Sequence, residues 1–497
     1  MAQAADLRTP NVELVALRED AGLSQEDLAE ALNELAHHRF GRRVDVTKKT
    51  VGRWERGEVV WPQPFHRRLL AECFQVAVDE LGFRRPRPAQ ADLHRPSSAR
   101  PDDLLTLAAA PGQPDPRVHK DQQHWREVRE AFGARRQTLA VLAEQLYPEH
   151  RLPGLEQTGV IAHRDWLPAA PVALGQVVLD RVEDALTPVV SGAERESAAV
   201  RPLAFAERRY RRYSHAVRDL ASPRLFENRL CFRLLGVDWS RPAVQLDFGA
   251  MGFFDAIDTN EALAHETALH HLARDTHGDL CLTKPSWRQL AFRKLIGNPF
   301  DLSRRSVTGA VGTLTIRAGE SPCVVLHKRD GANVAGGGGM VHLLPAGIFQ
   351  PSSVMPECVA NDFSLWRNVQ REYAEELLGH DEYDGTGCPI NYSNTEPFAT
   401  MDRALSSGAL RVYCLGITLD ALTLAADILT VAVIEPSLYD ELFADAVDSN
   451  TEGTIPTHAV PFEANTLEQL RRGGCLTPGA AAALHLTWQH RRQLLQS

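Results

Sequence analysis

Residues 23–57 read LSQEDLAEALNELAHHRFGRRVDVTKKTVGRWERG, and this stretch decides the fold of the N-terminal part of the chain. Its pattern predicts two short helices separated by a turn. Ser24 can cap the first helix because its hydroxyl can accept the backbone N–H of Asp27, and Thr47 can cap the second. Gly57 is placed to end the second helix in a left-handed conformation.

Each of these helices is expected to have one apolar face. In the first helix, apolar residues recur at helical spacing, at Leu28, Ala31, Leu32 and Leu35. In the second helix, Val51 and Trp54 are expected to be buried. The other positions of that helix then point outward, and they are Lys48, Lys49, Thr50 and Arg53.

Positive charge is concentrated around the second helix. Between residues 39 and 56 there are seven Lys or Arg and two acidic residues, in a chain whose formal net charge is −10. A basic patch on an acidic protein indicates a local site for a polyanion. A charge run alone is more often a solvated face, and the two-helix pattern is what favours binding.

The stretches LSQEDLAEAL and TKKTVGRWERG resemble the helix-turn-helix of the Xre/Cro/C1 repressor family, over residues 11–82. In that family the second helix lies in the major groove of double-stranded DNA, and its N-terminal residues contact base edges. The turn is longer here, from Ala36 to Val46, and its basic insert HHRFGRR could contact phosphate. The resemblance implies that Gln25 braces the phosphate backbone and that the residues facing DNA are Thr47, Lys48, Lys49, Thr50 and Arg53.

The whole chain has the composition of an ordinary soluble protein. A length of 497 residues predicts about three domains, and 44% hydrophobic residues suffice for their cores. No apolar run reaches the roughly 18 residues needed to span a bilayer, and the N-terminus lacks a signal-peptide pattern. The eight cysteines include no CxxC, which argues against a disulfide framework or structural zinc. Without a signal peptide, we expect a cytoplasmic, nucleoid-associated protein with no membrane partner, and the excess of Arg over Lys indicates the codon bias of a GC-rich bacterial genome.

The middle of the chain is less informative. Residues 84–117 contain seven prolines and are expected to form a Pro-rich linker. Residues 118–304 are expected to be helical and then mixed α/β. A helix over residues 118–147 could dimerise the protein or pack on the rest of its own chain, and residues 223–255 alternate as strands do.

Three motifs suggest functions that their details do not support. HETALHH at 265–271 has Leu269 where a zinc protease motif needs its second histidine. GGGG at 336–339 is not followed by the GK[ST] of a phosphate loop. The run AERRYRRYSHAVRD at 206–219 could bind nucleic acid, but it is more typical of a solvated helix face.

From residue 305 the pattern changes to strands and turns. VGTLTIRA, CVVLHKRD and MVHLLPAGIF predict successive strands, and DFSLWRNVQREYAEELLG predicts a helix after them. Glu372, Glu375 and Glu376 gather on adjoining faces of one turn of that helix. Such close like charges repel unless a cation or an arginine offsets them. Alone, they are more typical of a solvated surface helix.

The order of these elements resembles the Nudix fold, over residues 305–497. LLPAG at 343–347 is similar to the LPGG that opens the family's box. The resemblance implies an α/β domain in which glutamates hold Mg²⁺ or Mn²⁺ on a diphosphate. The box positions fall on Arg371 as the orienting residue, on Glu372, Glu375 and Glu376 as metal ligands, and on Glu372 as the catalytic base if the domain is an enzyme.

The box also departs from the family pattern. The gap from Gly347 to Arg371 is longer, the remaining glutamate of the box falls on Phe363, and Gly379 comes one residue late. These departures favour a degenerate domain that senses a ligand over an active hydrolase.

The sequence therefore predicts a multidomain protein: an all-α helix-turn-helix domain, a Pro-rich linker, a helical middle region and an α/β Nudix-like C-terminal domain. We expect a sequence-specific, DNA-binding transcriptional regulator that senses a nucleotide-type ligand. A homodimer is expected because one such helix reads few base pairs. The alternatives are a metal-dependent hydrolase of nucleoside-diphosphate derivatives that carries a DNA-binding module, and a protein–protein adaptor with a DNA anchor.

Overall fold

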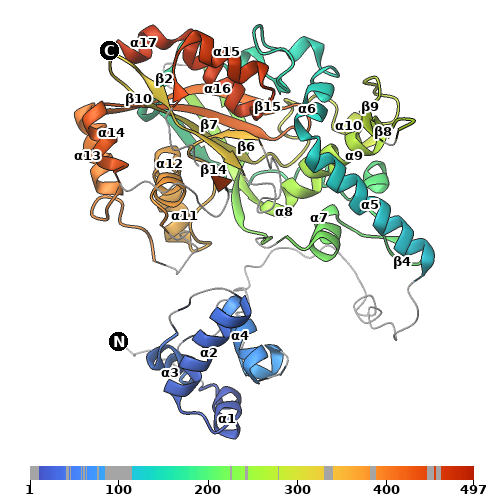
Figure 1. The fold of residues 1–497 in the computed structure, drawn as a ribbon, viewed down its shortest axis with the longest axis vertical. Coiled ribbons are helices and arrows are strands. Elements are labelled where there is room, and N and C mark those ends of the chain that lie inside the picture. Colours follow the sequence, from blue (N-terminus) through green and yellow to red (C-terminus); the bar gives the residue numbers. More distant parts are fainter. Residues whose placement is uncertain are drawn as a thin grey trace. The chain divides into compact units, whose positions relative to one another are not determined.

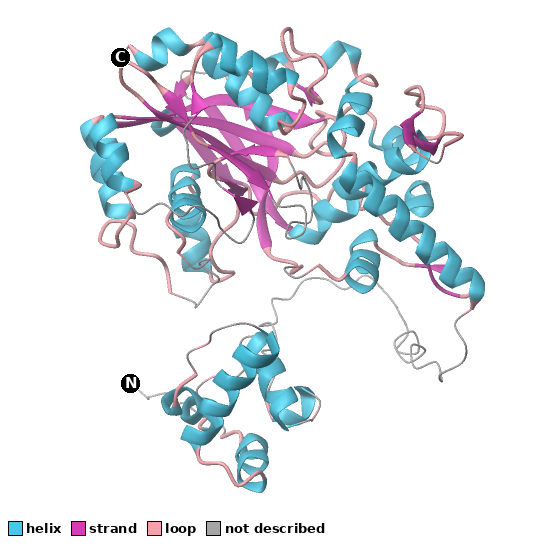
Figure 2. Cartoon of the chain, viewed as in Figure 1, coloured by secondary structure: helices cyan, strands magenta, loops and turns pink. Residues whose placement is uncertain are grey.

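A computed structural model gives two compact units, Met1–Ala110 and Pro111–Ser497. The first is helical, and the second is rich in strands (Figure 2). The chain is therefore multidomain. The structure describes residues 10–496 except for 41–43, 45, 58, 60–61, 63, 75, 77, 84–114, 224–225, 241–243, 278, 330–339, 381–387, 445–452 and 455–459.

The N-terminal unit is built from helices that share one small core (Figure 1). Leu14, Leu28, Leu32, Val51 and Trp54 all lie in that core. The two helices predicted between residues 23 and 57 are present. The elements of the unit are α1 (Val12–Asp20), α2 (Gln25–Phe40), α3 (Lys48–Glu55), α4 (Pro64–Phe74) and the 3₁₀ turn η1 (Val78–Leu81).

The predicted helix ends are present as well. The Asp27 N–H donates to Ser24 Oγ at 3.1 Å, and the Ser24 N–H donates to an Asp27 carboxylate oxygen at 2.8 Å. This reciprocal cap begins α2. At α3, Thr47 Oγ1 accepts the Thr50 N–H at 3.3 Å. Gly57 follows α3 with a φ of 68°.

The predicted start of the turn at Ala36 is wrong, because α2 continues to Phe40. The reason is that Ala36 is fully buried and extends the apolar face of Leu28 and Leu32 by one more turn. The side chain of Asn33 then fixes the chain before α3. It donates to the Val46 carbonyl and accepts the Val46 N–H, both at 2.9 Å.

The C-terminal unit is organised on one mixed sheet of order β1-β15-β16-β10-β11-β18, with β14 beside β10 and β2 beside β15. β10 and β16 run parallel, and β15 is antiparallel to β16. The strands are β1 (Val160–Ile161), β2 (Val172–Ala173), β10 (Gly309–Arg317), β11 (Cys323–Val324), β14 (Ala346–Ile348), β15 (Leu410–Asp420), β16 (Ala426–Ile434) and β18 (Val460–Pro461).

Residues on β16 alternate between two hydrophobic clusters, as expected for a sheet covered on both faces. Leu429 and Val431 join the cluster that contains the alanines of α16 (Pro478–Gln489). Ile428 and Ala432 join the cluster that contains the apolar side of α12 (Leu365–Glu372). Figure 1 shows α16 and α12 on opposite sides of the sheet.

Smaller sheets and helices complete this unit, and the strands predicted within 223–255 are β6 and β7. The strands are β3 (Val177–Arg181), β6 (Leu230–Asp238), β7 (Val244–Gly252), β12 (Leu326–Arg329), β13 (Val341–Leu343), β17 (Gly453–Thr454) and the hairpins β4 (Leu203–Phe205) with β5 (Arg208–Arg209) and β8 (Leu272–Arg274) with β9 (Leu280–Leu282). The α-helices are α5 (Pro116–Ala134), α6 (Arg136–Glu144), α7 (Tyr213–Ala216), α8 (Phe253–Ala256), α9 (Ala262–His271), α10 (Ala291–Ile296), α11 (Pro356–Asp362), α13 (Phe398–Ser407), α14 (Pro436–Leu442), α15 (Ala464–Arg472) and α17 (Arg491–Leu495), and the π-helical segments are η7 (Val217–Ala221), η8 (Ile257–Glu261) and η9 (Tyr373–Leu377).

Residues 118–304 and 305–497 share one core in this unit. β1 and β2 both pair with β15, with Val160 opposite Asp420. The helix expected over 118–147 is divided into α5 and α6, and Trp125, Phe132 and Leu139 pack in the same cluster as the residues of the sheet. The apolar side that could have served a dimer is therefore buried within the unit.

Two further expectations concern the Pro-rich linker and membrane-spanning segments. Most of the linker expected at 84–117 lies outside the described residues, and α5 already begins at Pro116. None of the helices in the described ranges has the length and apolar character required to cross a membrane.

Candidate nucleic-acid interface and carboxylate helix

α3 has a buried side and a charged, exposed side. Val51 and Trp54 are 0% and 2% exposed. Lys48, Lys49 and Arg53 are all exposed. The predicted division of this helix is therefore present, and the exposed side carries donors suited to phosphate or guanine.

The N-terminal end of α3 carries two further polar groups from the expected set. Thr47 is exposed and Thr50 is half-buried. Their hydroxyl oxygens lie 3.0 Å apart, so one hydroxyl donates to the other. Thr47 thus holds the first turn of α3 through both its backbone cap and this hydroxyl contact.

A buried carboxylate fixes how α1, α2 and α3 of the N-terminal unit meet. Glu55, at the end of α3, accepts hydrogen bonds from Arg18 Nε of α1 at 2.5 Å and from Gln25 Nε2 of α2 at 2.6 Å. The hydrogen bond to Glu55 raises the pKa of Arg18 above its ordinary value. Gln25, expected to brace a phosphate, therefore uses its amide nitrogen to join α2 to α3.

Gly52 of α3 lies close to the side chains of Gln25 and Arg56. A Cβ there would lie 3.3 Å from Gln25 Oε1 and 2.9 Å from an Arg56 guanidinium nitrogen. Sequence reasoning missed the pairing of Glu55 with Arg18 and Gln25. The available signal was an acidic residue inside an otherwise basic segment.

Of the basic insert, Arg42 and Arg43 lie outside the described residues, and nothing of the Arg39 side chain is described.

The glutamates of α12 and η9 face the protein more than the solvent. Glu376 is 6% exposed, and its carboxylate accepts the Ala346 N–H of β14 at 2.9 Å. Glu372 lies against the next residue of β14, because a Cβ on Gly347 would be 2.0 Å from Glu372 Oε1. Glu375 is half-buried. The solvated helix that the three glutamates suggest on their own is therefore not what the structure shows.

Arg371 is turned toward a different acid from the three glutamates. Its guanidinium lies 3.3 Å from Asp362 and donates to Tyr392 Oη at 3.0 Å and to the Gln350 carbonyl at 2.5 Å. Burial by itself would lower the pKa of Arg371, but the oxygens of Tyr392 and Asp362 raise it. Arg371 therefore holds together residues before and after its own helix.

Asp362 is the centre of this cluster and is fully buried. It accepts the Ser352 N–H at 2.8 Å, the Ser352 hydroxyl at 2.5 Å and the Tyr392 hydroxyl at 2.7 Å. Burial raises the pKa of Tyr392, which keeps its hydroxyl protonated and able to donate. Sequence reasoning missed Asp362, although it directly precedes Phe363, on which the remaining box glutamate fell.

Carboxylates at this helix are bonded to neighbouring groups of their own unit. Mg²⁺ and Mn²⁺ need several oxygens that converge on one point. Within the described residues, no three or more His, Cys, Asp or Glu side chains gather in a way that could hold a metal ion. Glu376 instead binds the backbone of β14, and Asp362 is enclosed by Ser352, Tyr392 and Arg371.

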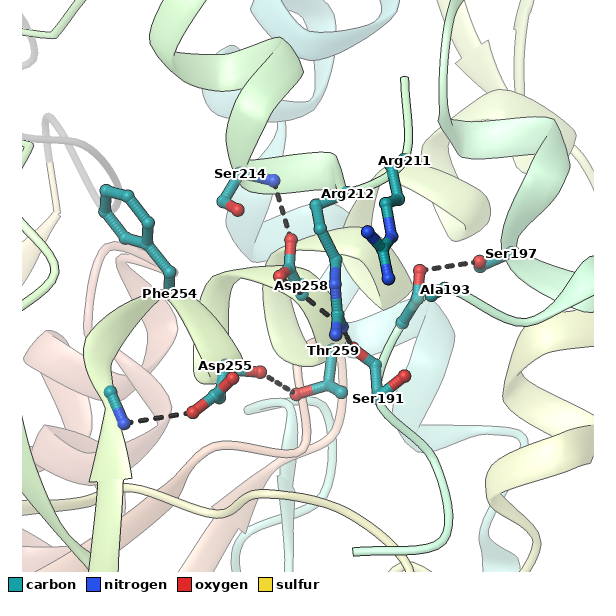
Figure 3. A network of polar contacts seen from close by, with 12 residues as sticks. Ser191, Ala193, Ser197, Arg211, Arg212, Ser214, Phe254, Asp255, Asp258 and Thr259 are labelled. Atoms are coloured by element: carbon teal, nitrogen blue, oxygen red, sulfur yellow. Dashed lines mark hydrogen bonds and ion pairs between the residues drawn. The ribbon is translucent and has the colours of Figure 1, made fainter. Parts of the chain in front are cut away.

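The arginine-rich run at 206–219 does not form one helix face as expected, because only its second half is helical. Its residues form β5, a short loop, α7 and the start of η7, and the polar contacts that follow are shown in Figure 3. Arg212 donates to the Ser191 carbonyl and lies 3.8 Å from Asp258, which accepts the Ser214 N–H at 2.7 Å. Asp258 is buried, which raises its pKa. Arg212 therefore ties the start of α7 to a loop and to η8.

Two of the three histidines of HETALHH, His265 and His271, make contacts inside the unit. His265 is buried, its Nδ1 lies 3.0 Å from Tyr213 Oη, and its ring stacks on Trp125 at a centroid distance of 5.4 Å. Burial lowers the pKa of His265 to about 3. His271 contacts Thr283 Oγ1 and the Ser286 carbonyl. Both rings thus serve the packing around α9.

Comparison with known proteins bears on the N-terminal unit. A family model described as the SP15 N-terminal domain matches residues 14–82. The match runs from α1 to the residue after η1 and so includes α3 and the Glu55 cluster. No curated protein matches the chain. The matched residues therefore include those of the candidate nucleic-acid interface.

Proposed function

We propose that the protein is a sequence-specific, DNA-binding transcriptional regulator whose residues 11–82 act as a helix-turn-helix of the Xre/Cro/C1 type. One observation carries the proposal: α3 exposes Lys48, Lys49 and Arg53, while Val51 and Trp54 hold its other side in the core. A helix with this division can enter the major groove without losing its own packing.

In this proposal the residues of α3 have distinct roles. The N-terminal residues Thr47, Lys48, Lys49 and Thr50 lie at the base edges, and Arg53 contacts guanine or phosphate one turn later. The Glu55 cluster keeps the angle between α2 and α3, so that the exposed side is presented as one rigid surface. Gln25 is a positioning residue for that surface.

Residues 111–497 are proposed to sense a ligand, with a Nudix-like domain in 305–497. Support comes from the order of elements, in which β10, β12, β13 and β14 precede α12, and β15 and β16 follow it. The engagement of Glu376 and Arg371 within the unit favours a sensing role over metal-dependent hydrolysis. A nucleotide-type ligand would act by binding one conformation of this unit better than another.

A homodimer is proposed because a single helix of this kind contacts few base pairs and selects poorly within a genome. Two copies would read two half-sites separated by one or more helical turns. The selected sequence itself tests this point, since a dimer requires an inverted repeat and a monomer yields one asymmetric half-site.

The experiment is selection of binding sites by the full-length protein from a pool of random duplex DNA. The test variant carries Lys48→Ala, Lys49→Ala and Arg53→Ala together. A matched control carries Arg164→Ala, Arg208→Ala and Arg211→Ala, which removes three exposed positive charges from the other unit.

The wild type and the control are expected to enrich one discrete sequence, and the test variant is expected to enrich none. Enrichment of the same sequence by the test variant would show that α3 is not the reading helix. A wild type that enriches no sequence would refute sequence-specific binding.

A further inference from the structure

α2 places an acidic side chain directly beside the proposed reading residues. The Glu26 carboxylate lies 3.4 Å from Lys48 Nζ, and the two side chains are 66% and 64% exposed. If Lys48 reaches the edge of a base, Glu26 reaches the same place, because the two groups are within one contact distance. The proposed interface therefore has an acceptor as well as donors.

The fold gives only a modest reason for an acid at this position, namely the weak attraction of a first-turn carboxylate to the positive end of α2. An exposed pair of this kind contributes little to stability. The start of α2 is already capped by Ser24 and Asp27, whose reciprocal hydrogen bonds leave no role for Glu26 in the cap. A carboxylate near DNA phosphates also opposes binding, since nucleic-acid affinity rises with the number of phosphates that the protein neutralises.

The chemistry of base edges supplies a reason. In the major groove a G·C pair presents two neighbouring acceptors, guanine N7 and O6, followed by one donor, the cytosine N4 amino group. A lysine ammonium only donates, and a carboxylate only accepts. Lys48 and Glu26 together thus match the G·C pair in order, acceptors facing the ammonium and the donor facing the carboxylate.

An A·T pair fits the same two side chains less well. Its donor, adenine N6, lies between the acceptors N7 and O4, so that an ammonium beside a carboxylate reaches only one of the two acceptors. The thymine methyl group then stands next to a charged side chain. The expected preference is therefore for G·C over A·T.

We propose that Glu26 and Lys48 jointly read one G·C base pair, with Lys48 donating to guanine and Glu26 accepting from cytosine N4. The proposal rests on the proposed function and names the base pair that this part of the interface selects. It makes Glu26 a specificity-determining residue that reduces affinity for sequences lacking the cytosine amino group.

The test measures the dissociation constant of the full-length protein for the selected duplex and for duplexes with each other base pair at each position. The proteins are wild type, Glu26→Ala, Glu26→Gln and the matched control Glu30→Ala, which removes the same charge one turn along α2 from another exposed position. Glutamine tests the acceptor alone, because its amide oxygen can still accept from cytosine N4.

At one position, wild type and Glu30→Ala are expected to prefer G·C by about tenfold or more, as for a good base contact. Glu26→Ala should lose that preference at this position only, and Glu26→Gln should keep part of it. An equal gain in affinity of Glu26→Ala for all duplexes would overturn the proposal, because Glu26 would then act only through its charge. An unchanged preference in Glu26→Ala would overturn it as well. A wild type with no preferred duplex would instead overturn the proposed function, and this reading with it.

Discussion

α3 and the segment formed by α12 and η9 are both short helical stretches rich in charge. They differ in whether their charged side chains face solvent or the interior of their own unit. On α3, Lys48 and Lys49 are exposed. On α12 and η9, Arg371 and Glu376 are buried and bonded to other elements of their own unit. Charge on a helix therefore does not by itself say whether it serves a ligand or the fold. Partners from distant parts of the sequence decide that.

The energetic reason is the high free energy of an unpaired charge away from water. Exposed lysines keep their hydration and need no partner. Arg371 is buried and is accommodated because Asp362, Tyr392 and the Gln350 carbonyl surround it. Substitutions should therefore affect folding at one segment and binding at the other.

The largest effect is expected at the inward-facing segment. Asp362→Ala removes the acceptor of Ser352 and Tyr392 and leaves Arg371 buried without its ion-pair partner. The free energy of unfolding should fall by about 3–5 kcal/mol, as measured by urea denaturation. The control is Asp440→Ala, whose exposed pairing with Arg317 should contribute little to stability. If Asp362→Ala and Asp440→Ala lose equal free energy of unfolding, the buried contacts of Asp362 stabilise the fold no more than an exposed ion pair does.

A second, smaller loss of stability is expected at Glu376. Glu376→Ala leaves the buried Ala346 N–H without its acceptor, which should cost about 1–3 kcal/mol of unfolding free energy. The matched control is Glu357→Ala, on the exposed side of α11. If Glu376→Ala is instead neutral for stability, the glutamate is not held in the position described, and a role in binding a ligand regains support.

At α3 the same kind of substitution should change binding and leave folding intact. Lys49→Ala and Arg53→Ala should each weaken binding to the selected duplex by about 1–3 kcal/mol if each contacts a base. Unfolding free energies should stay within about 0.5 kcal/mol of wild type. For a phosphate contact, all sequences would weaken alike and the salt dependence would fall by about one counterion. Binding unchanged in both variants would show that this side of α3 does not face DNA.

The last effect is absent at neutral pH and concerns the buried ring of His265 under acidic conditions. Its pKa is about 3 in the folded protein, against about 6.5 in an unfolded chain. The unfolded chain therefore binds a proton on this ring that the folded chain does not bind. The contribution of the neutral ring to the free energy of unfolding is fully present above pH 6.5 and is lost as pH falls toward 3. The loss is at most about 1.4 kcal/mol per pH unit.

The variant His265→Gln should show a shallower decline of unfolding free energy between pH 7 and pH 5 than wild type. Denaturation at three pH values in that interval measures the difference. Parallel slopes for the two proteins would mean that the ring is not buried as a neutral group.

The sequence predicted the elements whose signal is local. Ser24, Thr47 and Gly57 mark helix ends by their own chemistry, and the strand pattern of VGTLTIRA predicted β10. The burial of Val51 and Trp54 followed from helical spacing alone. Each of these inferences needed only a window of about a dozen residues.

What could not be predicted depends on contacts between distant residues. Arg371 meets Tyr392, which is 21 residues away, and Glu55 meets Arg18, which is 37 residues away. No periodicity encodes such pairs. The prediction of a solvated helix face for the run RRYRRY was wrong for a related reason, because no local pattern encodes the contact between Arg212 and Asp258. The base-reading and ligand-sensing roles remain predictions.

The pairing of β1 with β15 also bears on how the protein is made. Val160 pairs with Asp420, so one strand leaves the ribosome long before its partner exists. At about 5–20 residues per second, the roughly 260 intervening residues take on the order of 10 to 50 s to synthesise. During that time the apolar side of α5 has no completed core to cover it. We therefore expect chaperones to bind the nascent chain in this interval, and chains that terminate near residue 304 to be degraded rather than to accumulate as a separate domain.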